Sequence, residues 1–237
     1  MDRFTDRTVI VTGAAGARRT DRFAGLVDDL GHDRVIAAEL DVTDQEQWAA
    51  AVAAAEEASG PVSVLVDNAA QAIGGPVADL PVSDFGKVLE TNLVGTFLGI
   101  QAVVPSMRRG GGGNILNLNS VGGLGPAAGL VSYGASEWGV RGLTLTAAEE
   151  LARDGIRVNG FHPGIIETPL AHDPAGNLWS PVDDCAVPRL ATVEEISTYV
   201  AFLTSDDARF ATGTELLADG GFMLGPVSDT ATMPATG

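Results

Sequence analysis

The stretch Asn114-Ile-Leu-Asn-Leu-Asn-Ser120 is followed thirteen positions later (133 − 120) by Tyr133-Gly-Ala-Ser-Glu137. The first segment lies in a predicted strand. The second lies in a predicted helix that runs to about Arg153 and stops at Gly155, a residue type that often caps a helix C-terminus. Residues four positions apart share one helix face, so we expect Tyr133 and Glu137 to lie on the same side.

Short β-branched runs alternate with helical patterns along the chain, which predicts a parallel sheet covered on both faces. The predicted strands are Thr8–Thr12, Arg34–Leu40, Val62–Asp67, Gly113–Asn119, Ile156–Phe161 and Thr214–Ala218. Two helix starts match a capping box, Thr43 with Glu46 and Thr192 with Glu195. We expect one α/β domain over residues 1–225 and a loose C-terminal tail over residues 226–237.

Composition limits the classes of partner. A chain of 237 residues with 45% hydrophobic content can bury one sizeable core, and its net charge of −17 repels nucleic acids and anionic membranes. Cys185 is the only cysteine, which excludes an internal disulfide and fits a reducing compartment. The first residues lack the apolar run of a signal peptide. We therefore expect a cytoplasmic protein that binds neither nucleic acid nor membrane and holds no metal.

Several motifs stand in one consistent order along the chain. They are Asp67-Asn-Ala-Ala70, Thr91-Asn92, Ser120 with Tyr133, Arg157-Val-Asn159, Pro163-Gly164, Glu167-Thr168-Pro169 and Asp219-Gly-Gly221. In this order and spacing, nearly the whole chain from Thr8 to Gly225 resembles the short-chain dehydrogenase/reductase family. The resemblance implies a doubly wound, Rossmann-like sheet with catalytic roles for Ser120, Tyr133 and Asn92. The family has a lysine at the position of Glu137, where it lowers the tyrosine pKa and holds the nicotinamide ribose.

The first quarter departs from the family pattern. Thr12-Gly13-Ala-Ala-Gly16-Ala-Arg18 is one residue shorter than the family's glycine loop and lacks its third glycine. Only 28 positions (41 − 13) separate Gly13 from Asp41, which is room for one βαβ unit where the family has two. We therefore expect one strand and one helix fewer than usual, with Arg34–Leu40 moved inward beside Thr8–Thr12.

Five residues are candidates for holding a dinucleotide, if one binds. Gly13 and Gly16 would approach the pyrophosphate, and Asn68 belongs to the motif beside the cofactor. Glu39 and Asp41 follow Gly16 by 23 and 25 positions, close to the spacing of an acid that binds a ribose hydroxyl.

Glu137 is the residue with the largest expected consequence. A carboxylate beside Tyr133 raises the phenol pKa, and one pK unit corresponds to about 1.4 kcal/mol. Ordinary dehydrogenation should then be slow or absent. Two interpretations of Glu137 remain open: a general acid/base in the pocket, or a helix ion pair with Arg141 four residues later.

The substrate side of the predicted pocket contains three more candidates, His162, Pro163 and Trp179. His162 has either a catalytic or a structural role. Trp179 lies in residues 171–187, a proline-broken segment at the family's variable lid, and Phe222 is a further aromatic that could line the pocket.

Three hypotheses follow for function. The leading one is a repurposed pocket that needs no cofactor and performs acid/base chemistry, as an isomerase, dehydratase or cyclase, on an apolar oxygenated small molecule. The alternatives are an NAD(P)-dependent oxidoreductase acting on a ketone or secondary alcohol, and a catalytically inactive assembly subunit. The resemblance implies a homodimer or homotetramer in each case.

Overall fold

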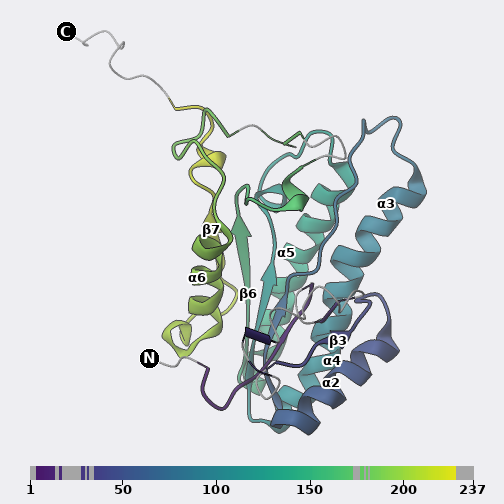
Figure 1. Ribbon diagram of the computed structural model, residues 1–237, viewed down its shortest axis with the longest axis vertical. Coiled ribbons are helices and arrows are strands. Elements are labelled where there is room, and N and C mark those ends of the chain that lie inside the picture. The colour runs from purple at the N-terminus through teal and green to yellow at the C-terminus, as the bar shows by residue number, and fades with distance from the viewer. Residues whose placement is uncertain are drawn as a thin grey trace, which may run out of the picture.

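The fold is built on one parallel sheet. The computed structural model describes residues 4–13, 16–17, 28–29, 31, 35–172, 177–178, 180 and 182–227. Within these residues the main sheet has the strand order β1-β4-β5-β6-β7, with all strands parallel (Figure 1). The strands are β1 (Thr8–Val11), β4 (Val62–Asp67), β5 (Gly113–Leu118), β6 (Ile156–Pro163) and β7 (Glu215–Ala218). The predicted Rossmann-like α/β class is therefore confirmed.

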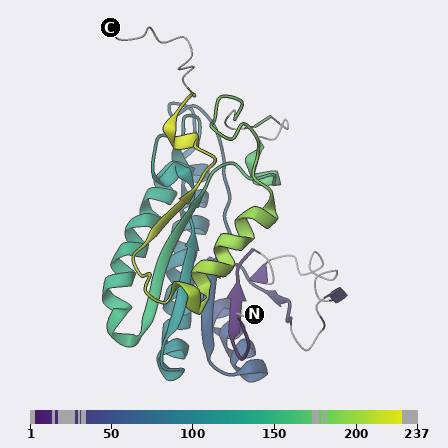
Figure 2. The same ribbon diagram turned by 90° about the vertical axis from the view of Figure 1, so that its left-hand side faces the viewer.

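Helices cover both faces of the sheet. On one face α2 (Gln45–Ser59), α4 (Gly95–Arg109) and α5 (Val131–Leu151) pack against the strands, and α6 (Val193–Thr204) packs on the opposite face (Figure 2). The larger core contains residues such as Trp48, Met107 and Ile115, each 0% exposed. Burial of this apolar surface is the main stabilising term in such a domain.

Shorter helical segments connect these elements. They are α3 (Val82–Leu89), the π-helical turn η2 (Glu90–Val94), and the 3-10 turns η3 (Val121–Gly123), η4 (Ala152–Asp154), η5 (Pro169–Ala171), η6 (Asp206–Ala208) and η7 (Phe222–Leu224). Together α3, η2 and α4 form a continuous helix, Val82–Arg109, that is long and apolar enough to cross a membrane by composition alone. Val103 and Met107 of this helix are fully buried in the core, as in the central helix of a folded domain.

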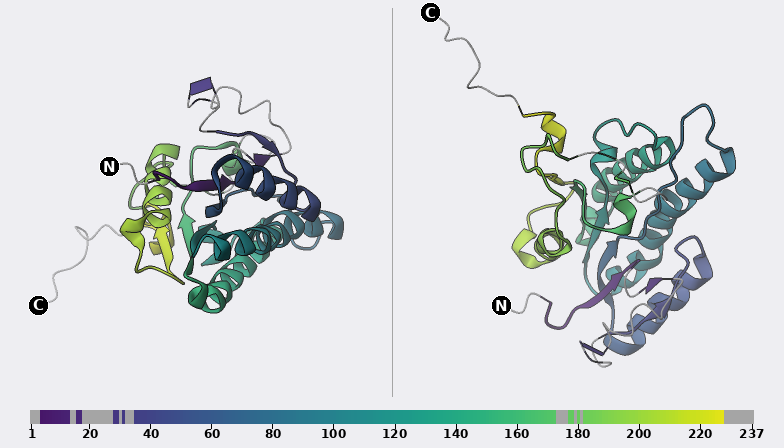
Figure 3. Two further views of the ribbon diagram at one scale, coloured as in Figure 1. Left: turned by 90° about the horizontal axis from the view of Figure 1, so that it is seen from below. Right: turned by 45° about the horizontal axis from the view of Figure 1, so that its top comes forward.

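The segment before α2 differs from the prediction. Among the described residues of this segment, 28–29, 31 and 35–44, only Ala38–Glu39 (β3) forms a strand, and it pairs in parallel with Gly16–Ala17 (β2) in a separate two-stranded sheet (Figure 3). The expectation that Arg34–Leu40 moves beside β1 is therefore wrong. Leu40, 2% exposed, enters the core directly after β3, and this ends the strand after two residues.

Two of the three predicted helix boundaries are confirmed. Thr192 and Glu195 form the expected capping box at the start of α6. Gly155 ends η4 in the left-handed conformation, with φ of 70°. At α2 the cap is Asp44 rather than Thr43, because the Asp44 carboxylate accepts from the backbone N–H groups of Glu46 and Gln47.

Candidate active site

A crevice of about 600 Å³ lies at the carboxyl ends of the strands, the edge at which ligands bind in open α/β sheets. Each of four strands is followed by residues that line it. These are Gly13 after β1, Asn68–Ala72 after β4, Asn119–Gly122 after β5, and Pro163–Ile166 at the end of β6. Asp41 after β3 and Tyr133 on α5 complete its polar wall.

Ser120 and Tyr133 lie on this wall together, as the sequence predicts. Ser120 caps η3, where its hydroxyl accepts from the backbone N–H of Gly122 at 3.2 Å. The Tyr133 ring packs over Gly122 and is half-buried. Burial first, and then the Glu137 charge, raise the pKa of Tyr133 above its ordinary value, while a side-chain hydrogen bond with Ser120 lowers it. Tyr133 is therefore a phenol at neutral pH.

Glu137 does not line the crevice. Its side chain is 3% exposed, and its Oε2 has no hydrogen-bond partner. Burial raises the pKa of Glu137 to about 8, and a hydrogen bond from the Ser120 backbone opposes this shift. At neutral pH the carboxyl is therefore mostly protonated, and it acts as a buried neutral group.

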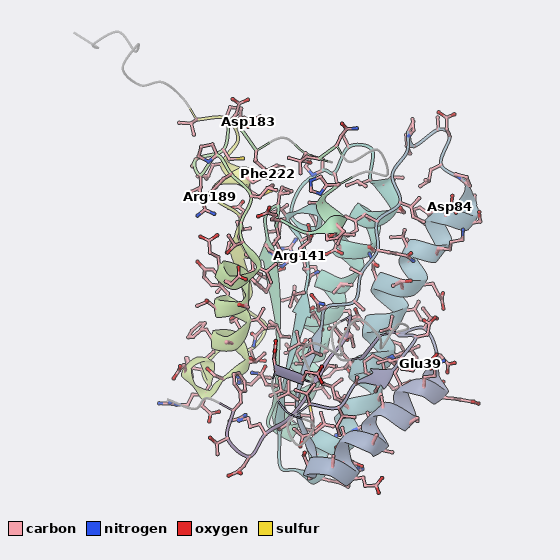
Figure 4. All side chains as sticks on the ribbon, viewed as in Figure 1. Glu39, Asp84, Arg141, Asp183, Arg189 and Phe222 are labelled. Carbon is pink, nitrogen blue, oxygen red and sulfur yellow. The ribbon has the colours of Figure 1, made fainter. Side chains whose placement is uncertain are left out.

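Arg141 is not the partner of Glu137. Its guanidinium forms a bidentate ion pair with Glu215 on β7, with Nη2 2.9 Å from Oε2, and it lies between α5 and β7 (Figure 4). The Arg141 Cζ also lies 5.3 Å from the centroid of the Trp138 ring, which is a cation–π contact. Glu137 and Arg141 therefore do not form the helix ion pair that their spacing allows.

Asn92 lies in η2, beneath the crevice, and is 3% exposed. Its amide Nδ2 donates to the Gln71 carbonyl and to Ser136 Oγ, both at 3.0 Å. Its Oδ1 accepts from the Gln71 backbone N–H at 2.9 Å. Asn92 thus holds the loop after β4 against α5, and π-helical turns of this kind are frequent at functional sites.

His162 is completely buried on β6, behind Ser120. Its Nδ1 lies 3.0 Å from the Ser120 carbonyl oxygen, and its Nε2 lies 3.5 Å from Glu215 Oε1. Burial is the main cause that lowers the pKa of His162, so the ring is neutral at pH 7. His162 touches the site through the Ser120 backbone, while its neighbour Pro163 lines the crevice.

The candidates on the cofactor side divide into two groups. Gly13, Asn68 and Asp41 line the crevice, Glu39 is exposed outside it, and Gly16 pairs with Ala38 in the two-stranded sheet. Asp41 Oδ1 accepts from the backbone N–H and the hydroxyl of Thr43, at 3.0 and 2.8 Å. Of the two proposed ribose acids, only Asp41 is therefore in position.

The crevice has features that fit a nicotinamide dinucleotide. Gly13 has φ of +71°, and a Cβ added there would lie 3.1 Å from both Asn68 Nδ2 and Ala69 Cα. Gly13 therefore lets the loop after β4 pack closely against the end of β1, which a larger residue at this position would prevent. The same cavity continues to Ser120, Tyr133 and Pro163, so one ligand can extend from the β1 side to the predicted catalytic residues Ser120 and Tyr133. Residues 14 and 15 of the glycine loop lie outside the described residues.

The substrate side of the crevice is apolar. Its lining residues include Val121, Pro126, Leu130, Ile165, Leu170 and Phe222. Phe222 lies above the sheet, close to the C-terminal end of the described chain (Figure 4). Trp179 lies outside the described residues, and Trp138 is 51% exposed, away from the crevice. In the part of the chain described, no group of three His, Cys, Asp or Glu side chains is arranged to hold a metal.

Two residues with roles at this site were not predicted from the sequence. Gln71 lines the crevice and donates to Thr91 Oγ1 at 2.6 Å, in addition to its backbone contacts with Asn92. Its position directly after the Asp67–Ala70 motif is the one feature of the sequence that could have indicated a place in the site. Glu215 lies beside both Arg141 and His162, but nothing local to β7 in the sequence indicates these partners.

Comparisons with known proteins identify relatives over most of the chain. Residues 5–223 match the family described as Enoyl-(Acyl carrier protein) reductase. The chain is 41% identical over 196 residues to trans-4-hydroxycyclohexanecarboxylate dehydrogenase of Sinomonas cyclohexanicum, covering 83% of this chain and 74% of the relative. It is 39% identical over 214 residues to 3-alpha-(or 20-beta)-hydroxysteroid dehydrogenase of Mycobacterium bovis, covering 86% and 79%.

A solved structure shares the fold. Gluconate 5-dehydrogenase from Burkholderia cenocepacia, in complex with NADP and tartrate, superposes with a TM-score of 0.83 at 27% identity, covering 92% of this chain and 95% of that one.

These relatives are named as dehydrogenases, and they overturn the leading expectation of a cofactor-independent isomerase, dehydratase or cyclase. That expectation assumed an ionised Glu137 next to the phenol. The structure gives a physical reason for the error: burial keeps Glu137 mostly protonated at neutral pH, so the charge that was assumed to disable the site is largely absent.

Proposed function

The chain belongs to the short-chain dehydrogenase/reductase family, and from this we propose that it is an NAD(P)-dependent oxidoreductase. Its proposed reaction interconverts an uncharged alicyclic ketone and the corresponding secondary alcohol. The observation that carries the proposal is that Ser120 and Tyr133 line the same crevice as Gly13 and Asp41. Relatives named for hydroxycyclohexanecarboxylate and hydroxysteroid oxidation support the alicyclic substrate class.

The chain's own residues have defined roles in this proposal. When bound, the nicotinamide supplies a hydride to the carbonyl carbon of the substrate, or accepts one from the carbinol carbon. Ser120 donates a hydrogen bond to the substrate oxygen and orients it. Tyr133 donates its phenolic proton to the same oxygen during reduction. Gly13, Asp41 and Asn68 would hold the nucleotide, and Pro163–Ile165 would border the nicotinamide.

The described lining of the crevice contains no cationic residue, which supports an uncharged substrate. Of the described residues that line the crevice, only Asp41 and Tyr133 are ionisable. Residues 110–140 and 158–188, which contain most of the described residues that line the crevice, include no lysine or arginine. A substrate carboxylate would lose its hydration without gaining a charged partner, in a protein of net charge −17. We therefore propose that neutral cyclic ketones are preferred over their carboxylate derivatives.

Two measurements test this function. Titration with NADH and NADPH, followed by thermal shift, should raise the melting temperature with at least one of them. Turnover of cyclohexanone should then exceed turnover of 4-oxocyclohexanecarboxylate in kcat/KM by at least about 10-fold, since one unpaired charge costs more than 1.4 kcal/mol. Binding of neither nucleotide would contradict the oxidoreductase proposal. A preference for the carboxylate would contradict only the substrate class.

We also propose a homodimer or homotetramer in the cytoplasm. Phe97, Trp138 and Leu145 are 47%, 51% and 41% exposed on α4 and α5, and apolar surface of this kind supports self-association. Sedimentation of the protein at several concentrations tests the oligomeric state, and a monomer at all of them would contradict it.

A further inference from the structure

The backbone of Ser120 is held by two buried side chains that do not line the crevice. On one side, His162 Nδ1 lies 3.0 Å from the Ser120 carbonyl oxygen. A carbonyl oxygen can only accept a hydrogen bond, so Nδ1 must carry the proton. The neutral ring then has a bare Nε2, which agrees with the absence of a hydrogen-bond partner for that atom.

The position of His162 is itself fixed. The ring is 0% exposed, and a Cβ added at Gly160 would lie 3.4 Å from its Nε2, so the strand leaves little free space beside it. Glu215 lies 3.5 Å from Nε2 and is anchored by Arg141. The ring is thus enclosed by β6 and β7 and oriented toward Ser120.

Glu137 acts on the other side of the same residue. Asn119, the residue before Ser120, donates from its Nδ2 to the backbone carbonyl of Glu137 at 3.2 Å. A hydrogen bond from the Ser120 backbone is the cause that lowers the pKa of the Glu137 carboxyl, against the larger effect of burial. A Cβ added at Gly123 would lie 3.3 Å from the Glu137 Cβ, so α5 packs directly under η3 at this point. Since Glu137 is 3% exposed and does not line the crevice, it acts on the substrate indirectly, through Ser120 and its neighbours and, when ionised, through the pKa of Tyr133.

We propose that Glu137 and His162 are a pair of positioning residues that clamp the Ser120 backbone through its N–H and its carbonyl, and so fix the Ser120 hydroxyl for the substrate oxygen. This inference rests on the proposed oxidoreductase function. It assigns the buried acid at the family's lysine position a role as a hydrogen-bond acceptor. Neither side chain exchanges a proton with the substrate.

The clamp predicts which substitutions are tolerated. Glu137→Gln keeps an acceptor oxygen in the same place, whereas Glu137→Ala removes it. His162→Asn keeps an N–H donor at the position of Nδ1, whereas His162→Leu removes it. A displaced catalytic group costs about 100-fold in rate, and loss of one of two holding contacts should cost about 10- to 100-fold.

The kinetic test compares these four variants with the wild type. Glu137→Ala and His162→Leu should lower kcat about 10- to 100-fold while KM and nucleotide affinity change little, because the lost interaction is made in the transition state. Glu137→Gln and His162→Asn should recover most of that loss. A purely structural role would instead lower the melting temperature without the selective loss of kcat. Equal kcat in the alanine, leucine and wild-type proteins would overturn the clamp.

A second readout does not depend on activity. Nitrogen NMR of His162 should show the Nδ1-protonated neutral tautomer, and hydrogen exchange at the Ser120 amide should be faster in Glu137→Ala than in Glu137→Gln. An Nε2-protonated neutral ring, or equal exchange in the two variants, would overturn the clamp. If the wild type turns over no alicyclic ketone, the proposed function fails while these measurements still decide the clamp.

Discussion

Tyr133 and Glu137 lie one turn apart on α5, but the phenol lines the crevice while the carboxyl is 3% exposed beneath η3. Burial raises the pKa of both groups, and that of Glu137 reaches about 8. The acid at the family's lysine position is therefore neutral under ordinary conditions. The described lining of the crevice offers the hydroxyl groups of Tyr133 and Ser120 and contains no cationic side chain that could stabilise a phenolate.

Tyr133→Phe should remove most of the turnover. The change deletes the proposed proton donor and leaves the ring packed over Gly122, so we expect kcat to fall by about 100- to 10,000-fold while the protein stays folded. Ketone reduction followed by nicotinamide absorbance measures the loss, with circular dichroism as the control for folding. Substantial activity in the folded variant would show that another group supplies the proton.

Glu137→Gln should change how stability depends on pH. The pKa of Glu137 is about 8 in the folded protein and 4.5 in an unfolded chain, so the folded protein binds more protons between these pH values. The contribution of Glu137 to the free energy of unfolding is therefore fully present below pH 4.5. It decreases as the pH rises toward about 8, by up to about 1.4 kcal/mol per pH unit. Urea unfolding at several pH values measures this, and the variant should lack this component. Parallel curves for the two proteins would show that Glu137 is ionised throughout.

The two directions of the reaction should respond differently to pH. In the proposed mechanism, reduction uses the Tyr133 phenol, which is fully populated at neutral pH, whereas oxidation requires its phenolate. The ionised Glu137 raises the Tyr133 pKa further. The rate of alcohol oxidation should therefore begin to rise at a lower pH in Glu137→Gln than in the wild type. Profiles of kcat against pH for both directions test this. Superimposable oxidation profiles would exclude an electrostatic effect of Glu137 on the phenol.

Two glycines provide a matched test of packing. A Cβ at Gly99 would lie 2.8 Å from both Asp67 Oδ1 and Trp48 Cζ2, so Gly99→Ala should destabilise the fold by about 1–3 kcal/mol. Gly142, on the exposed side of α5, has nothing within 4 Å of an added Cβ. Gly142→Ala should be neutral or stabilise by about 0.5–1 kcal/mol. Denaturant midpoints measure both, and a loss of stability at Gly142 comparable to that at Gly99 would contradict the packing described.

Much of the fold follows from local patterns. Buried parallel strands appear as short apolar runs, and the five strands of the main sheet lie within one or two residues of their predicted limits. The Thr192–Glu195 capping box was predictable because both of its hydrogen bonds form within one helical turn. At α2 the same pattern was misleading, since Asp44 competes with Thr43 for the same backbone groups.

The parts that the sequence did not predict depend on contacts between distant residues. Arg141 is four residues from Glu137 but pairs with Glu215, which is 74 residues away. Once that pair forms, Glu137 has no cation beside it, and its buried position favours the protonated form. Local spacing therefore placed Ser120, Tyr133 and Glu137 close together but gave the wrong charge to Glu137, and with it the wrong function.

Transfer of deuterium from nicotinamide deuterated at C4 to a cyclic ketone tests the central proposal most directly. The account predicts that mass spectrometry will find the deuterium on the carbinol carbon of the alcohol product, with NADH or NADPH as the donor. Consumption of the ketone without deuterium in the product, or failure of both nucleotides to bind, would contradict it.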